Sequence, residues 1–498
     1  MFASLQSVDA TDARADAVTR FEEAPAWQHR RRRALMAASI VVMGAGSYVV
    51  ARSGAGSSPG PRPPATASSH AAPGHPVVNA AALRGHGSLA FISDGGLWLL
   101  DGATGSLRPL PTGGGTPQHP AFSADGRWLS YTATSGPHGD QLREWVARAD
   151  GSDAGSVRLH GGTSVIGWGP HGHLLAEARF VGHSLFALSL LNPLGTRSTL
   201  GTVRGFWDAT WAPDGRSLAV TTNGGVTGTT KLLTYPVDGR PPVTWLARRF
   251  HHDPLNGMQQ PLLDLAGWWP HQGIGVWVIG DGAVSTNDQA PLDLIRSPSA
   301  RPRLLGRTLL GVDSTAVTAS RSGWLALVNN SPRAFGRLIW QGKHILVCAP
   351  ERGSCEQPTT ARASVSLDPS WSPNGHTLAF VDAPASDSPG FPQHTVARWY
   401  AAHDLELYDA TRHTLRTLPA ANGASAPQWS PDGGSLLYTA RDGIWLLASL
   451  TGTPVRIATP LLPRHAWGAY YGQVDWSGQF AWDPRTPTAA APPPAPAR

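Results

Sequence analysis

Short apolar runs separated by turn-forming residues dominate most of the chain. Leu-Ala-Val at 218–220, Leu-Ala-Phe at 378–380 and Leu-Leu-Tyr at 436–438 each follow shortly after an Asp-Gly or Asn-Gly pair. Such pairs form tight turns between antiparallel strands, and apolar runs of this length are typical of strands rather than helices. Gly contributes 56 and Pro 44 of the 498 residues, which also favours many turns between short elements. The pattern therefore predicts an all-β fold.

A five-residue motif recurs along the chain between about residues 83 and 483. It begins with an aromatic residue and ends with Asp, Asn or His followed by Gly. Complete copies begin at Phe122, Trp168, Trp211, Trp371 and Trp429, weaker copies at Trp268 and Trp476, and a register without the aromatic residue lies at 319–323. Successive registers are about 43 to 58 residues apart, a period typical of propellers and solenoids. The motif positions expected to be structural are Phe122, Asp125, Gly126, Trp168, Gly172, Trp211, Asp214, Gly215, Trp268, Trp371, Asn374, Gly375, Trp429, Asp432, Gly433 and Trp476.

Each repeat contains enough apolar segments for four strands. The run after the motif is followed by a second one, such as 405–409, and by a short third one, such as 415–418, and the segment that ends at the aromatic residue is the fourth. Four antiparallel strands per repeat are the pattern of a β-propeller blade. The registers predict eight blades, or seven if the two weakest registers form one. Reuse of one Trp per blade explains why the chain has 20 Trp but 12 Phe and 8 Tyr.

The two ends of the repeat region complement each other. Residues 87–110 contain three of the expected strands but lack the strand that ends at the aromatic residue. Residues 473–477, Gln-Val-Asp-Trp-Ser, lie at the other end and match that missing strand. We therefore expect both ends to share one blade, which removes the exposed edges of an open ring.

The repeat resembles a known family. Trp-Ser-Pro-Asp-Gly at 429–433, with the strand after it and the Arg-Thr-Leu signal at 416–418 in the preceding repeat, is similar to the TolB-like, WD-repeat-like propeller repeat of exported bacterial proteins. The resemblance covers about residues 83–483 and implies a β-propeller fold. It does not select an activity, because this repeat occurs in binding proteins, in non-catalytic halves of peptidases and in stand-alone exported proteins.

An uncharged segment near the N-terminus has the features of a membrane anchor. Residues 30–33 are four consecutive arginines, and residues 34–51 carry no charge. Eighteen helical residues span about 27 Å, the thickness of the hydrocarbon core. The arginines predict a cytoplasmic N-terminus and an extracytoplasmic C-terminal part. The alternative is a cleaved signal peptide with Val-Val-Ala at 49–51 as the cleavage site, which would release a secreted protein.

These features predict five regions along the chain. They are a cytoplasmic tail at 1–33, a transmembrane anchor at 34–51, a linker rich in Pro, Ser, Gly and Ala at 52–82, the propeller at 83–483 and a disordered Pro/Ala-rich tail at 484–498.

Polar residues one or three positions before the motif aromatics are candidates for lining a central channel. They are His119, Asp208, Asp368, Gln428, Gln473 and Asp475. A functional interpretation makes His119, Asp208, Asp368 and Asp475 a metal or substrate site, whereas the alternative is that they solvate a narrow channel or cap turns. Ligands from different blades have no diagnostic spacing, so no metal or cofactor is predicted. The pairs His171/His173 and His251/His252 lie in polar turns and are also not assigned to a metal.

Cys348 and Cys355 are the two cysteines, and they bracket a turn-rich stretch. In an oxidising compartment this spacing predicts a disulfide that joins the two arms of a hairpin. Two free structural thiols are the alternative.

The motifs of common enzymes are missing from the sequence. It contains no Gly-x-Ser-x-Gly elbow, P-loop, dinucleotide fingerprint or His-Glu-x-x-His helix, so no catalytic residue is predicted. The net charge is +6, but beyond 30–33 the arginines are scattered, which argues against nucleic-acid binding. The sequence predicts a non-catalytic, membrane-tethered extracytoplasmic propeller that binds a protein or cell-envelope ligand. A small-molecule enzyme or sensor with a metal or polar site on the propeller axis is the alternative.

Overall fold

The computed structural model of the protein describes residues 74–485 apart from internal gaps. The gaps are residues 136–140, 151–156, 160–161, 224–228, 250, 254–256, 260–261, 280–289, 309–315, 331–342, 350–354, 360–363, 386–397, 441–442, 462–475 and 477. The predicted cytoplasmic tail, anchor and most of the linker lie outside the described residues, as does most of the C-terminal tail. Within the described part, no helix has both the length and the apolar composition needed to cross a bilayer.

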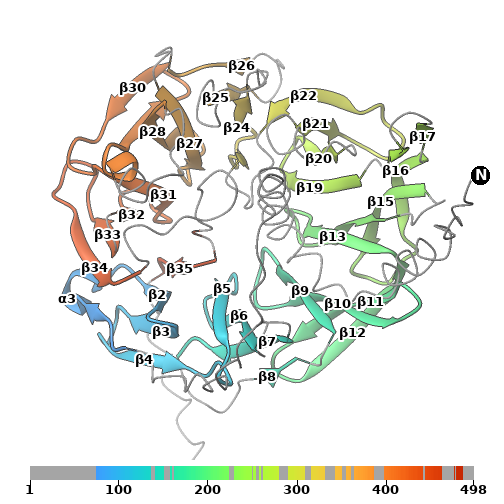
Figure 1. Cartoon of the computed structure of the whole chain (residues 1–498), viewed down its shortest axis with the longest axis horizontal. Coiled ribbons are helices and arrows are strands. Elements are labelled where there is room, and N and C mark those ends of the chain that lie inside the picture. The colour runs from blue at the N-terminus through green and yellow to red at the C-terminus, as the bar shows by residue number, and fades with distance from the viewer. Residues whose placement is uncertain are drawn as a thin grey trace, which may run out of the picture.

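Antiparallel sheets arranged in a ring make up the fold, as Figure 1 shows. Four four-stranded sheets follow the chain order. They are β5 (Thr116–Phe122), β6 (Trp128–Ser135), β7 (Gln141–Arg148) and β8 (Val157–Arg158); β9 (Thr163–Trp168), β10 (Leu175–Gly182), β11 (Leu185–Asn192) and β12 (Thr196–Arg204); β13 (Phe206–Trp211), β14 (Ser217–Thr222), β15 (Thr229–Pro236) and β16 (Val243–Arg249); and β27 (Ser364–Trp371), β28 (Thr377–Pro384), β29 (Asp404–Asp409) and β30 (Thr414–Thr417). The all-β prediction is confirmed, and the ring of four-stranded sheets is the architecture of a β-propeller.

Three further sheets depart from this simple order. One eight-stranded sheet contains β19 (Leu262–Trp269), β20 (Gly273–Ile279), β21 (Ala290–Ile295), β22 (Arg303–Thr308), β23 (Val317–Ala319), β24 (Leu325–Asn330), β25 (Lys343–Cys348) and β26 (Cys355–Glu356). A two-stranded sheet pairs β17 (His251–Asp253) with β18 (Gly257–Gln259), and a five-stranded sheet contains β31 (Ala424–Trp429), β32 (Leu436–Ala440), β33 (Gly443–Leu447), β34 (Val455–Thr459) and β1 (Val77–Val78). Strand β1 and the short helix α3 (Ala80–Leu83) precede residue 83, so the folded part begins earlier in the chain than the sequence pattern indicates.

The last sheet joins the two ends of the chain. β35 (Phe480–Asp483) pairs with β2 (Ser88–Ser93), which continues into β3 (Gly96–Asp101) and β4 (Leu107–Leu110). Trp482 stands opposite Leu89, just as Trp211 stands opposite Leu218 in its own sheet.

The strand that closes the ring differs from the one expected at residues 473–477. Trp482, and not Trp476, occupies the motif position in this sheet. The Trp-Ser-Gly at 476–478 resembles the motif, but pairing of the whole apolar run determines the register of a strand, and Phe-Ala-Trp at 480–482 is the run that pairs with β2.

Hydrogen bonds within the motif explain why its residues recur. Ser430 Oγ donates to Asp432 Oδ1 at 2.5 Å, and the same oxygen of Asp432 accepts from the Gly434 N–H at 3.0 Å. Gly433 has a φ of 71°, which favours glycine. Ser372 and Asn374 repeat the side-chain contact at 2.6 Å. The motif is therefore a self-contained turn that connects one strand to the next.

The connections divide between the two faces of the ring. In an antiparallel sheet, the turns from first to second strand and from third to fourth strand lie on one face, and the turn from second to third strand lies on the other. We call the first the motif-turn face, because every motif turn lies there. We call the opposite one the loop face; residues 398–403, which lead into β29, lie there.

Candidate functional site

Three of the inner strands contain a β-bulge at the position three residues before the motif aromatic. His119, Asp368 and Ala426 occupy this position and have φ values of 53°, 50° and 50°. The pairing of β5, β27 and β31 with their neighbours shifts register at these residues. A bulge leaves its extra residue without a regular partner in the ladder, so the backbone N–H there needs another acceptor.

In four repeats the backbone N–H three positions before the aromatic, whether or not it lies in a bulge, donates to a group of the preceding sheet or of the segment leading into that sheet. Asp208 Oδ2 accepts a hydrogen bond from the Leu265 N–H at 3.2 Å, and Asp368 Oδ2 accepts one from the Ala426 N–H at 2.9 Å. Glu144 Oε2 accepts from the Val165 N–H at 2.6 Å, and the Gly478 carbonyl accepts from the His119 N–H at 2.9 Å. Two of the carboxylates that the sequence suggests for a channel site therefore hold neighbouring sheets together.

The predicted channel residues do not meet at one point in the described structure. Asp208 and Asp368 each bond to a different neighbouring sheet, and Gln428 lies half-buried opposite Leu437. Burial raises the pKa of Asp368, and the hydrogen bond from Ala426 lowers it in part. Among the described residues, no group of three or more His, Cys, Asp or Glu is arranged to hold a metal ion. Gln473 and Asp475 lie outside the described residues.

The histidine pairs lie in different surroundings. His173 Nδ1 is 2.6 Å from Asp125 Oδ2, so this side chain links two motif turns of adjacent sheets. His251 and His252 belong to β17, and their side chains lie outside the described residues.

Three of the motif tryptophans join successive sheets by a repeated hydrogen bond, whereas Trp371 Nε1 has no hydrogen-bond partner among the described residues. Trp168 Nε1 donates to the Ala121 carbonyl at 2.9 Å, Trp211 Nε1 to the Gly167 carbonyl at 2.9 Å, and Trp429 Nε1 to the Ser370 carbonyl at 3.0 Å. In each case the acceptor is the residue just before the aromatic of the preceding repeat. These tryptophans are structural, because their polar atoms are used in the ring itself.

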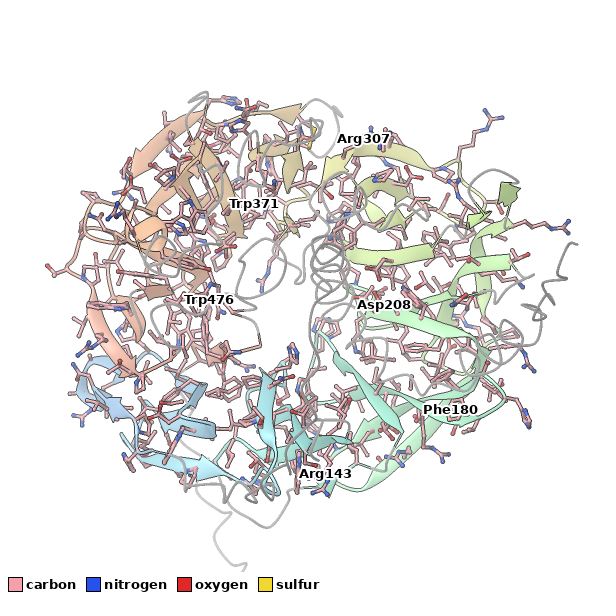
Figure 2. All side chains as sticks on the ribbon, viewed as in Figure 1. Arg143, Phe180, Asp208, Arg307, Trp371 and Trp476 are labelled. Carbon is pink, nitrogen blue, oxygen red and sulfur yellow. A yellow bond between two sulfur atoms is a disulfide. The ribbon has the colours of Figure 1, made fainter. Side chains whose placement is uncertain are left out.

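A different set of aromatic residues gathers on the loop face. The aromatic–histidine cluster consists of Trp399, Tyr400, His403 and Trp476. The His403 ring centroid lies 4.4 Å from that of Trp399 and 5.1 Å from that of Tyr400, and Tyr400 lies 6.5 Å from Trp476. Tyr400 and Trp476 are half-buried, whereas Trp399 and His403 are buried. Figure 2 shows Trp476 on the left half of the ring and Asp208 on the right half.

His403 is the polar centre of this cluster. Its side chain is 2% exposed, and burial lowers its pKa to about 4, so the imidazole is neutral at neutral pH. Nδ1 lies 3.1 Å from the Ala424 carbonyl, which assigns the ring proton to Nδ1 and leaves Nε2 as an acceptor. Nε2 has no hydrogen-bond partner among the described residues.

The aromatic–histidine cluster has the features of a binding surface. Half-buried aromatic rings offer apolar contact area with polar edges, as binding surfaces commonly do. Sequence analysis missed this cluster because Trp399, Tyr400 and His403 lie before β29 and Trp476 lies before β35. These two segments share no repeat pattern. The adjacent Trp399 and Tyr400 after a polar, proline-containing stretch were the available signal.

Comparison with known proteins gives similarities of fold at low identity. No family model matches the chain, and no curated protein matches it. The chain is similar to the solved structure of a eukaryotic initiation factor, at 14% identity, over 77% of this chain and 87% of that chain, with a TM-score of 0.45. TolB from Acinetobacter baumannii matches at 14% identity, over 73% of this chain and 76% of that chain, with a TM-score of 0.32. An oligogalacturonate lyase in complex with manganese matches at 10% identity, over 78% and 86% of the two chains, with a TM-score of 0.40. Scores at this level carry no argument about activity or ligand.

Proposed function

We propose that the protein is a non-catalytic, membrane-tethered β-propeller that binds a protein or cell-envelope ligand outside the cytoplasm through its loop face. One observation carries this proposal. Asp208 and Asp368 are engaged in joining sheets, whereas Tyr400 and Trp476 stand half-buried on the loop face. Loops held by a rigid scaffold are common places for binding residues.

We propose eight blades for the ring. Five four-stranded sheets and the five-stranded sheet supply six of them. The eight-stranded sheet supplies two, because its halves, β19–β22 and β23–β26, are joined between β22 and β24 by the single pair Thr308 and Asn329. The first strand of each half, β19 or β23, ends at one of the weak motif registers, at Trp268 or at 319–323.

The proposed location rests on the N-terminal sequence and on the disulfide. Residues 34–51 form the anchor in this proposal, with the N-terminus in the cytoplasm, and cleavage after residue 51 remains the alternative. The structure contains a disulfide between Cys348 and Cys355. Because disulfides persist in oxidising compartments, this bond supports a position outside the cytoplasm.

Crosslinking and recovery from cell envelopes test the proposed binding face. The full-length chain is compared with the double variant Tyr400→Ala/Trp476→Ala and with Arg216→Ala, an exposed residue on the motif-turn face. We expect wild type and Arg216→Ala to recover the same envelope component and the double variant to lose it about tenfold or more. Equal recovery by all three variants would exclude the loop-face cluster as the binding site.

A further inference from the structure

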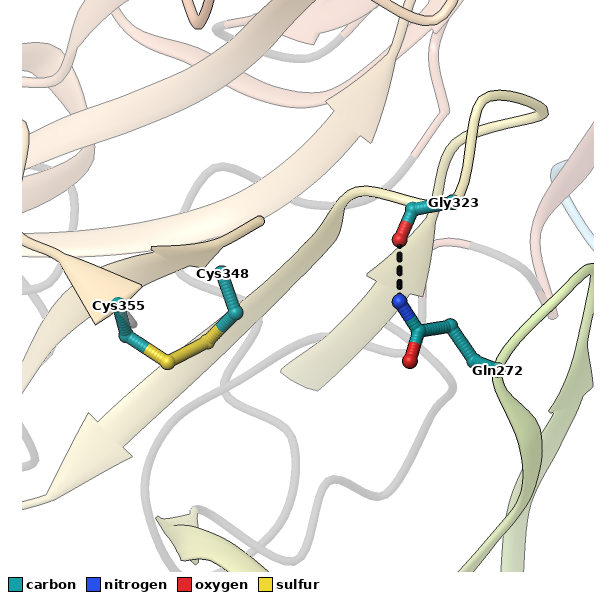
Figure 3. Close-up of a disulfide and its surroundings, with 4 residues drawn as sticks. All are labelled: Gln272, Gly323, Cys348 and Cys355. Atoms are coloured by element: carbon teal, nitrogen blue, oxygen red, sulfur yellow. Dashed lines mark hydrogen bonds between the residues drawn. A yellow bond between two sulfur atoms is a disulfide. The ribbon is translucent and has the colours of Figure 1, made fainter. Parts of the chain in front are cut away.

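The Cys348–Cys355 disulfide belongs to one of the shortest strand pairings in the ring. β26 has two residues, and its ladder with β25 consists of two pairs, Val347 with Glu356 and Cys348 with Cys355. The disulfide therefore reinforces one of these two pairs (Figure 3). A ladder this short gives little stability by itself, because each ordered residue loses conformational entropy.

The residue next to the disulfide reaches across to the neighbouring sheet. Glu356 accepts a hydrogen bond from the hydroxyl of Tyr408 on β29, and His413 Nδ1 lies 2.9 Å from each of the two Glu356 carboxylate oxygens. Tyr408 is 3% exposed, and burial raises the pKa of its hydroxyl, so it stays protonated and donates. Glu356 is thus a polar bridge between β26 and the outer part of the next sheet.

The same two sheets are also held together by apolar contacts that do not involve Glu356. A large apolar cluster runs through both and includes Leu327, Val347, Trp371 and Phe380. Loss of the Glu356 contact would therefore open the outer rim between the sheets and leave the core closed.

We propose that the Cys348–Cys355 disulfide is a redox latch that holds Glu356 against Tyr408 and His413 and so controls the outer contact between two neighbouring sheets. In an oxidising compartment the latch is closed. A dithiol reductant opens it, and a disulfide oxidant closes it again.

The difference in exposure between the two cysteines determines the order of steps. Cys355 is exposed, whereas Cys348 is 4% exposed. A thiolate of the dithiol attacks Cys355 Sγ, the sulfur–sulfur bond breaks, and Cys348 leaves as a thiolate that takes up a proton. The second thiol of the reductant then attacks the mixed disulfide, releases Cys355 as a thiol and becomes oxidised itself. Two electrons pass from the dithiol to the protein.

Hydrogen exchange of the full-length protein, with dithiothreitol as the reductant, tests the latch. We expect reduction to speed exchange of the Cys355 and Glu356 amides, and of β29 and β30, by about tenfold or more, with β13 and β14 unchanged. The variant Cys348→Ser/Cys355→Ser should reproduce this pattern without reductant.

A second variant separates the latch from a purely structural disulfide. Glu356→Ala keeps the disulfide and should still speed exchange in β29 and β30. Unchanged exchange in these strands, after reduction or in Glu356→Ala, would overturn the proposal. A general loss of protection in all sheets on reduction would also overturn it, because the bond would then be required for the fold as a whole.

Discussion

The motif-turn face and the loop face of the ring are built in different ways. On the motif-turn face, short turns contact one another from sheet to sheet. The Asp125 N–H donates to the Gly172 carbonyl at 3.0 Å, and Gln272 Nε2 donates to the Gly323 carbonyl at 2.7 Å (Figure 3). On the loop face, the aromatic rings of Tyr400, just before β29, and Trp476, just before β35, come together and follow no repeat.

This difference separates two uses of the same residue type. Trp168, Trp211 and Trp429 donate hydrogen bonds to the preceding sheet, whereas Trp476 lies edge-on to Tyr400, with the ring centroids 6.5 Å apart. The same hydrogen bond recurs in three copies of the motif, which indicates a structural use. The ligand contact that we propose therefore lies on the loop face, at Tyr400 and Trp476, which do not occupy the repeated motif position.

The largest expected effect distinguishes Trp482 from Trp476. Trp482 is 8% exposed, and its Nε1 donates to the His86 carbonyl at 2.7 Å. Trp482→Ala should lower the free energy of unfolding by about 3–5 kcal/mol, because it leaves a cavity in the sheet that closes the ring. Denaturant unfolding of the full chain measures this loss.

The matched control for this prediction is Trp476→Ala on the loop face. Trp476 is half-buried, so its replacement should cost about 1 kcal/mol or less. Equal losses for the two variants would contradict the assignment of Trp482 as the closing residue.

The second prediction concerns pH and the buried histidine of the loop face. His403 has a pKa of about 4 in the folded protein against an ordinary value of 6.5. The unfolded chain therefore takes up a proton on this side chain as the pH falls through 6.5, while the folded protein does so only near 4. The contribution of neutral His403 is complete above pH 6.5 and is lost between 6.5 and 4, by about 3 kcal/mol in all.

The free energy of unfolding, measured at several pH values between 7 and 4, checks this slope of stability against pH. His403→Phe should remove this part of the slope, and His376→Phe, at an exposed histidine on the motif-turn face, should leave it in place. A slope that survives in His403→Phe would assign the pH dependence to other groups.

The smallest expected effect concerns the carboxylates that join neighbouring sheets. Asp208→Ala removes the acceptor for the Leu265 N–H and should cost about 1–3 kcal/mol, since a buried donor loses its partner. Asp208→Asn keeps an oxygen acceptor and should lose less. Asp214→Ala, in an exposed motif turn, is the control and should cost about 1 kcal/mol or less. No difference between the two alanine variants would argue against a structural role for Asp208.

Much of the fold was predictable because its strongest signals are local. The turn at 430–434 is stabilised by contacts among neighbouring residues, so its sequence identifies it wherever it occurs. The role of Asp368 was not predictable in this way, because the Ala426 N–H that it accepts from lies 58 residues away. The aromatic–histidine cluster was missed for the same reason, since Tyr400 and Trp476 meet only after the ring closes.

The sequence by itself determined the all-β class, the repeat and the turn chemistry, because five consecutive residues are enough to build a motif turn. The tertiary structure alone decided which tryptophan closes the ring and what the inner carboxylates bind. Trp482 and its acceptor His86 are 396 positions apart, and that contact exists only when the first and last strands lie in one sheet. Contacts between sheets depend on how the ring closes, and no short stretch of sequence encodes that closure.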